Sequence, residues 1–113
     1  MADTRLAFVH EADLQLEPGT DPATVGAAVT TALCGHWEHE GPCRWPHNNA
    51  VGARGPRTSF RTLFVAPPAD EDEVRKRIEG VLREAAGWVV LETRERPLDR
   101  SERPLARRLA GGR

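Results

Sequence analysis

The chain has 113 residues, enough for one domain with a single core. Its formal net charge of −1 provides no overall attraction to nucleic acid or to an anionic membrane, and 39% hydrophobic with 29% charged residues is typical of a globular protein. No apolar run approaches the roughly 20 residues of a membrane-spanning helix, and no signal-peptide core follows the first residues. We therefore expect a cytoplasmic protein with no membrane partner.

The first expected elements are a strand over residues 6–16 and a helix after it. Hydrophobic and polar residues alternate along the strand, as is typical of half-buried β structure, and a Pro-Gly pair predicts the turn that ends it. The helix is expected to begin at Pro22 and to stop at Gly35. Its apolar stripe has helical spacing and comprises Val25, Ala28, Val29, Ala32 and Leu33.

His10 falls on the apolar phase of the first strand. The interpretation we favour is an interior histidine held by hydrogen bonds, because a buried polar group needs a partner. The alternative is that His10 lies on a functional open face of the sheet, where it acts as a remote metal ligand or as a general base.

The middle of the chain is expected to be a long connection followed by a strand. Residues 48–57 are rich in turn formers and predict a loop. The whole irregular connection is expected to run from Pro42 to Thr58. Residues 59–65 predict the next strand, and a Pro-Pro pair stops it.

A second helix and a last strand complete the expected elements. Asp70 is the expected helix cap, Glu73 its capping-box partner and Gly87 the stop. The last strand is expected over residues 88–93.

The two halves of the chain repeat the order strand, helix, strand. With Trp37–His39 as a short second strand, the order becomes β-α-β-β-α-β. This order predicts an α+β, ferredoxin-like two-layer sandwich over residues 1–95, with a four-stranded antiparallel sheet and two helices on one face. Residues 96–113 are rich in arginine and contain prolines, and we expect a mobile tail. Acidic residues are interspersed and no aromatic residue is available for stacking, so we expect no nucleic-acid partner.

Side chains that bind soft metals are concentrated in one short segment. They are Cys34, His36, His39, Cys43 and His47. Thiolate and imidazole are the side chains that hold zinc and other divalent transition metals. The pair Cys34 and His36 shares one face of an extended segment, and Cys43 and His47 have a spacing seen for His pairs in zinc sites. These four residues predict a tetrahedral site, with His39 as a substitute or as a residue that faces elsewhere. The spacing matches no standard zinc module.

The leading functional hypothesis is a small metal-binding protein with its ligand loop over residues 34–58. Four protein ligands leave no open position, which favours a structural or sensing role over catalysis. No phosphate-binding glycine loop or nucleophile motif indicates an enzyme.

Three alternatives stay open for this segment. The first is structural: Trp37 and Trp45 pack the loop under the sheet, and Cys34 is a small core residue. The second is a metal-free homodimer that binds a ligand or a protein through the open sheet face. The third is a thiol redox protein or enzyme with Cys43 as the reactive group, and a disulfide between Cys34 and Cys43 is compatible with the sequence.

Overall fold

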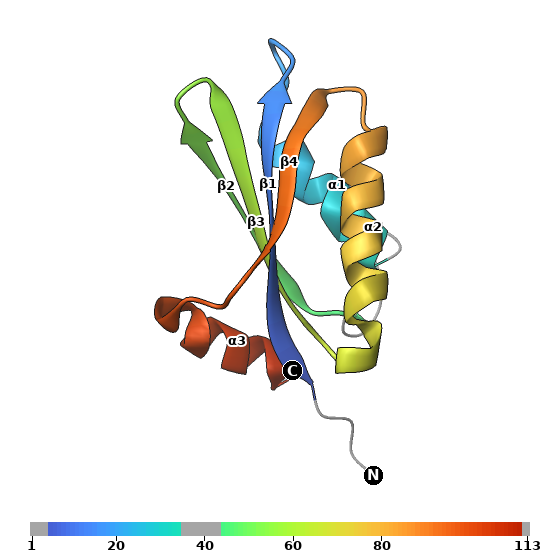
Figure 1. The fold of residues 1–113 in the computed structure, drawn as a ribbon, viewed down its shortest axis with the longest axis vertical. Helices are drawn as coiled ribbons and strands as arrows, with labels where there is room; N and C mark the ends of the chain where they lie inside the picture. The colour runs from blue at the N-terminus through green and yellow to red at the C-terminus, as the bar shows by residue number, and fades with distance from the viewer. Residues whose placement is uncertain (1–4, 35–43, 112–113) are drawn as a thin grey trace.

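A computed structural model describes residues 5–34 and 44–111, which form a mixed α+β fold (Figure 1). Within this part of the chain, four strands form one antiparallel sheet and three α-helices pack around it. In chain order the elements are β1 (Leu6–Leu16), α1 (Ala23–Cys34), β2 (His47–Arg54), β3 (Arg57–Ala66), the 3-10 turn η1 (Pro68–Asp70), α2 (Glu71–Glu84), β4 (Trp88–Arg96), the 3-10 turn η2 (Arg100–Glu102) and α3 (Arg103–Ala110).

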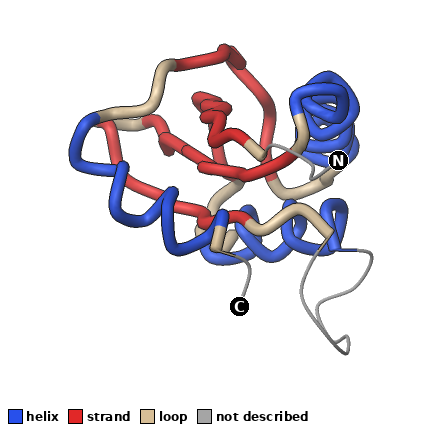
Figure 2. Tube along the Cα trace, turned by 90° about the horizontal axis from the view of Figure 1, so that it is seen from below, coloured by secondary structure: helices blue, strands red, loops and turns tan. Residues whose placement is uncertain are grey.

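The strand order in the sheet is β2-β3-β1-β4, so β1 and β3 are central and β2 and β4 form the edges. Each neighbouring pair is antiparallel. The mixed α+β class and the four-stranded antiparallel sheet expected from the sequence are therefore confirmed. Figure 2, viewed along the long axis, shows the strands as a twisted layer with helical segments on more than one side of it. In the described residues, no helix is long and apolar enough to cross a membrane.

The sheet face that meets α1 and α2 holds the main hydrophobic core. Successive side chains of a strand point to opposite faces, and Ala12 and Leu14 of β1 lie on this one. The helices contribute the buried residues Val25, Val29 and Leu33 from α1 and Val74, Ile78 and Leu82 from α2. The α1 residues belong to the apolar stripe predicted from the sequence, and both predicted helices are confirmed.

The C-terminal residues differ from the mobile tail expected from the sequence over 96–113. A capping box between Asp99 and Glu102 fixes η2, and α3 follows it directly. Leu105, Ala106 and Leu109 of α3 belong to a second hydrophobic cluster, together with Val9 of β1 and Leu63 and Val65 of β3. The helix is short, so its stability depends on this apolar patch, which lies on the face of β1 opposite to Ala12 and Leu14.

The region after the ligand cluster also differs from the expectation. Residues predicted as a loop form most of β2, which pairs with β3 from His47 opposite Phe64 to Arg54 opposite Arg57. The pairing overrides the turn preference of the asparagines and glycine in this segment. Gly55, with φ of 61°, makes the turn between the two strands. The strand predicted at Trp37–His39 lies outside the described residues.

The predicted capping box at the start of α2 is wrong. Asp70 makes no side-chain cap to this helix. Its Oδ2 instead accepts a hydrogen bond of 3.1 Å from Trp45 Nε1, and the Glu73 carboxylate accepts one of 2.8 Å from Arg77 Nε. Both side chains expected to form the capping box therefore bond to other partners, Asp70 to the distant Trp45 and Glu73 to Arg77 one turn along α2.

Candidate functional site

Two of the five predicted metal ligands, Cys34 and His47, lie on either side of residues 35–43, which the structure does not describe. His36, His39 and Cys43 lie outside the described residues. Cys34, the last residue of α1, is disulfide-bonded. His47 is the first residue of β2. Among residues 5–34 and 44–111, no group of three histidine, cysteine or acidic side chains is arranged to hold a metal ion, and the metal site stays a prediction.

The His47 ring is held by two hydrogen bonds. Nδ1 lies 3.1 Å from the Trp45 carbonyl oxygen, which can only accept, so Nδ1 carries the proton. Nε2 therefore accepts from the Thr30 hydroxyl of α1 at 3.0 Å. Burial lowers the pKa of His47, which keeps the ring neutral. A backbone carbonyl that orients Nδ1–H is also found behind metal-binding histidines, although here the Nε2 lone pair is taken by Thr30.

Trp45 anchors the start of β2 in the core. Its side chain is 1% exposed, and its Nε1 donates to Asp70. The guanidinium carbons of Arg44 and Arg77 lie 4.5 and 4.9 Å from its ring centre, at cation–π distance. The structural interpretation of this tryptophan is confirmed, whereas Trp37 lies outside the described residues.

His10 is an interior histidine, as favoured from the sequence, and is 2% exposed. Arg75 Nη1 donates to its Nδ1 at 2.9 Å, so the neutral ring carries its proton on Nε2. Nε2 lies 3.1 Å from Glu79 Oε2, at ion-pair distance but outside hydrogen-bond alignment. Burial, followed by the neighbouring Arg75 charge, lowers the pKa of His10.

Arg75 is itself buried between α2 and the sheet, with 8% of its surface exposed. Its Nη1 also donates to the Val9 carbonyl at 2.9 Å, and its Nε donates to Glu71 at 2.9 Å. Its guanidinium lies 5.4 Å from the Phe64 ring centre. These contacts satisfy a cation in the interior, and they make the pair with His10 a structural network.

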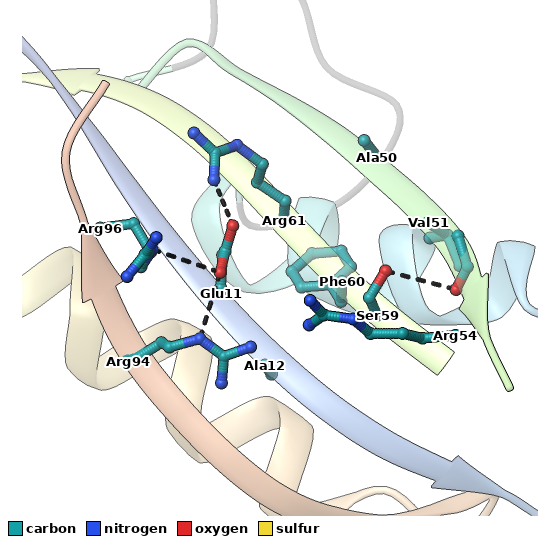
Figure 3. Close-up of a pocket in the computed structure, with 11 residues that line it drawn as sticks. Glu11, Ala12, Ala50, Val51, Arg54, Ser59, Phe60, Arg61, Arg94 and Arg96 are labelled. Carbon is teal, nitrogen blue, oxygen red and sulfur yellow. Dashed lines mark hydrogen bonds and ion pairs between the residues drawn. The ribbon is translucent and has the colours of Figure 1, made fainter. Parts of the chain in front are cut away.

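The other face of the sheet carries a hollow of about 560 Å³ (Figure 3). We call it the arginine hollow, because the charged side chains of its lining are Arg54, Arg61, Arg94, Arg96 and Glu11. They come from all four strands: Arg54 from β2, Arg61 from β3, Glu11 from β1, and the remaining two arginines from β4. Antiparallel register places Glu11 directly opposite Arg61 on one side and Arg94 on the other.

Glu11 is the centre of this charge cluster, as Figure 3 shows. Arg61 Nη1 donates to its Oε2, and Arg94 Nε donates to its Oε1 at 3.2 Å. Arg96 Nε lies 3.8 Å from the same Oε1. Three cations therefore converge on one carboxylate that is 20% exposed.

Two of the four arginines are fixed by further carboxylates. Arg61 donates to Glu102 of η2 through Nε at 2.8 Å and Nη2 at 2.6 Å, and the hydrogen bonds with Glu102 raise the pKa of Arg61. The same contact lowers the pKa of Glu102. Arg94 Nη2 donates to both oxygens of Asp13 at 3.1 and 3.2 Å, and this bond raises the pKa of Arg94. These contacts hold both cations in fixed positions.

The other two arginines are more loosely held. The Arg54 side chain is 68% exposed and lies 4.0 Å from Asp13, and the Arg96 side chain is 53% exposed. In Figure 3, Arg54 lies on the side of Phe60 and Ser59, away from the group around Glu11. The hollow thus combines two arginines held by ion pairs with two exposed guanidinium groups at different ends.

Sequence reasoning missed this site. Arg54, Arg61 and the pair Arg94 and Arg96 are separated by long stretches of chain, and Arg96 falls in the segment expected to be a mobile tail. One signal was available: Arg94 and Arg96 are two residues apart, as are Glu11 and Asp13, and such pairs share one face of a strand. The partner across the strands could be found only from the register.

No protein-family model and no curated protein sequence matches the chain. Among solved structures, the fold is similar to "De novo designed protein Foldit4", with a TM-score of 0.53 and 10% sequence identity over 83% of this chain and 100% of that chain. At this identity the similarity shows the mixed α+β fold alone.

Proposed function

We propose that this protein is a small binding module, and that the arginine hollow binds a ligand bearing an oxyanion such as a phosphate or a carboxylate. We interpret its scaffold as a ferredoxin-like sandwich with an added C-terminal helix. The antiparallel order β2-β3-β1-β4, with α1 and α2 as the connections, supports this interpretation. The proposal corresponds to a metal-free binding module that uses the open sheet face.

One observation carries the proposal: four guanidinium groups line one concave surface against a single lining carboxylate. Carboxylates outside the lining offset two of these cations, since Arg61 pairs with Asp99 and Glu102, and Arg94 pairs with Asp13 and Glu92. The charge open to a ligand is therefore that of the exposed Arg54 and Arg96. Guanidinium groups match the geometry of two-oxygen anions, and a concave cationic surface raises the local anion concentration. The hollow therefore favours an anionic ligand over an apolar one.

The lining favours binding over catalysis. Both carboxylate oxygens of Glu11 are occupied by hydrogen bonds, Oε2 from Arg61 and Oε1 from Arg94, so Glu11 is not turned toward a ligand. The Ser59 hydroxyl donates to the Gly52 carbonyl at 3.4 Å and lies beside no histidine base in the lining. Recognition through Arg54 and Arg96 is the chemistry that this arrangement supports.

Titration of isotope-labelled protein with inorganic phosphate and with succinate tests the proposal. We expect the Nε–H resonances of Arg54 and Arg96 to shift, and Arg54→Gln with Arg96→Gln to weaken binding by about tenfold or more, since each charge-assisted hydrogen bond contributes about 1.5–3 kcal/mol. Arg103→Gln with Arg108→Gln is the matched control, because it removes the same charge from exposed positions of α3. Equal losses in the two double variants would contradict a defined site.

A metal site near Cys34 and His47 is a second proposal, in a structural or sensing role with zinc or another divalent transition metal. The orientation of His47 supports it, since Nδ1–H is bonded to a carbonyl, and a metal at Nε2 would replace the Thr30 hydroxyl as the partner of its lone pair. Zinc requires cysteine thiolates, so the disulfide at Cys34 must be reduced first. We expect about one equivalent of zinc to bind after reduction and none before it. Equal zinc uptake by reduced wild type and by reduced Cys34→Ser would contradict this site.

A further inference from the structure

The outer edge of β2 is an open strand edge beside the arginine hollow. This strand pairs with β3 without a register shift over its full length, from His47 to Arg54. It is the terminal strand of the sheet, and no described strand pairs with its other side. Within residues 5–34 and 44–111, the backbone groups on that side have no strand partner, which is the arrangement that accepts another extended chain.

The two edges of the sheet differ in how they resist strand pairing. The β4 edge carries the charged residues Glu92, Arg94, Glu95 and Arg96, and its pairing with β1 has a register shift at Asp13 and Leu14. Charges and such irregularities are the usual means by which proteins block an edge. Residues 48–53 of β2 contain no charged residue and no proline, and they are mostly exposed. This edge has neither form of protection.

The side chains of β2 leave a path from this edge into the arginine hollow. Ala50 lies opposite Arg61, and Gly52 lies opposite Ser59, so both occupy the face that carries the hollow. Both residues line the hollow. Because their side chains are small, they form little barrier between the hollow and the outer edge of β2. Arg54 ends the strand on the same face. An added strand would direct every second side chain over these residues toward the arginines.

We infer that the ligand of the arginine hollow is an extended acidic segment of another protein, which adds to β2 as a fifth strand and places alternate carboxylates against Arg54 and the hollow behind it. This inference rests on the proposed anion-binding function. Charge complementarity selects this occupant over a second copy of the chain. A second β2 edge offers only neutral residues between 48 and 53, so it would bring no carboxylate to the exposed Arg54 at the end of the strand.

A fluorescent seven-residue peptide of alternating glutamate and valine tests the inference by anisotropy. Its controls are the same peptide with glutamine for glutamate, and one with proline at the two central positions. We expect the acidic peptide to bind at least about tenfold tighter than either control, because only it combines carboxylates with strand pairing. Arg54→Gln should bring its affinity close to that of the glutamine peptide. The backbone amides of β2 should also exchange more slowly in the complex.

Three other outcomes would contradict the inference. If the proline peptide binds as well as the acidic one while phosphate still shifts Arg54 and Arg96, strand addition is wrong and the anion site stands. If neither peptide nor phosphate binds, the proposed function fails as well. If the free protein sediments as a dimer with protected β2 amides that the peptide does not release, a second copy occupies the edge and the inference is overturned.

Discussion

At the scale of single residues, buried polar side chains are held by partners from distant parts of the chain. His10 of β1 is bonded to Arg75 of α2, and Trp45 is bonded to Asp70. The sequence predicted that His10 would be interior because it lies on the apolar phase of a strand. It did not predict Arg75 as the partner, because an arginine on a helix is usually solvated. Its burial depends on how the helix packs on the sheet.

The first prediction concerns pH. Burial and Arg75 lower the pKa of His10 below its ordinary value of 6.5, and burial lowers that of His47. The unfolded chain then binds more protons than the folded one as pH falls below 6.5, so the stability contributed by neutral His10 is present above that pH and is lost as pH falls through the folded pKa. We expect the free energy of unfolding, measured in urea between about pH 5 and 8, to fall on the acid side.

His10→Asn provides the control for this dependence. The asparagine oxygen can accept the Arg75 hydrogen bond but does not titrate in this range. We expect the variant to be less stable at neutral pH and to show a shallower dependence on pH than wild type. An unchanged slope would show that His10 does not cause the loss.

The second prediction concerns Arg75. Replacement with alanine removes the donor to His10 and to the Val9 carbonyl, and leaves Glu71 without its ion-pair partner. We expect a loss of about 3 kcal/mol in unfolding free energy, within the range for breaking a buried ionic network. The matched control is Arg83→Ala on an exposed position of the same helix, where the change should stay within about 0.5 kcal/mol. Similar losses in both variants would contradict a structural role specific to Arg75.

At the scale of elements, hydrophobic periodicity predicted the strands and helices whose buried residues form a long, regular pattern in the sequence. β1 alternates over its full length and α1 has a regular stripe, and both are present. β2 and α3 were missed for different reasons. In β2, turn-forming asparagine and glycine hide a strand that exists because β3 supplies a partner. In α3, eight residues are too few for a stable isolated helix, and its order depends on the patch formed by Val9, Leu63 and Val65.

The third prediction tests the docking of α3. Ala106 is 7% exposed and belongs to the cluster with Val9 and Leu63, so Ala106→Asp would bury an unpaired carboxylate there. We expect α3 to detach and trypsin to cleave after Arg107 and Arg108 about tenfold faster than in wild type. Ala110→Asp, on an exposed position of the same helix, should leave the cleavage rate unchanged. Equal cleavage of the two variants would contradict the packing described for α3.

At the scale of the whole molecule, charge is distributed unevenly although the formal net charge is only −1. One sheet face is covered by α1 and α2, and the other is shared between α3 and the arginine hollow. The metal-ligand cluster could be recognised in the sequence because its residues lie close together in one short segment. The hollow was not, because Arg54, Arg61 and Arg94 converge only when the strands adopt their order and register.

The fourth prediction follows from this distribution of charge. Oxyanion binding in the hollow should weaken by tenfold or more between about 50 and 500 mM sodium chloride, since salt screens exposed charges such as Arg54 and Arg96. The unfolding free energy should change far less, because the main core is apolar. Isothermal titration calorimetry and urea denaturation at both salt concentrations measure the two quantities. Binding that is insensitive to salt would contradict recognition by the exposed arginines.

The pairing of Glu11 has a consequence for the kinetics of folding. This residue meets Arg61 across 50 positions of the chain and Arg94 across 83. Contacts of such long range form only after large chain loops have closed, which slows folding. The arginine hollow should therefore be completed late, after the local hairpin of β2 and β3. We expect any fragment that lacks β1 or β4 to keep local structure but to have no arginine hollow.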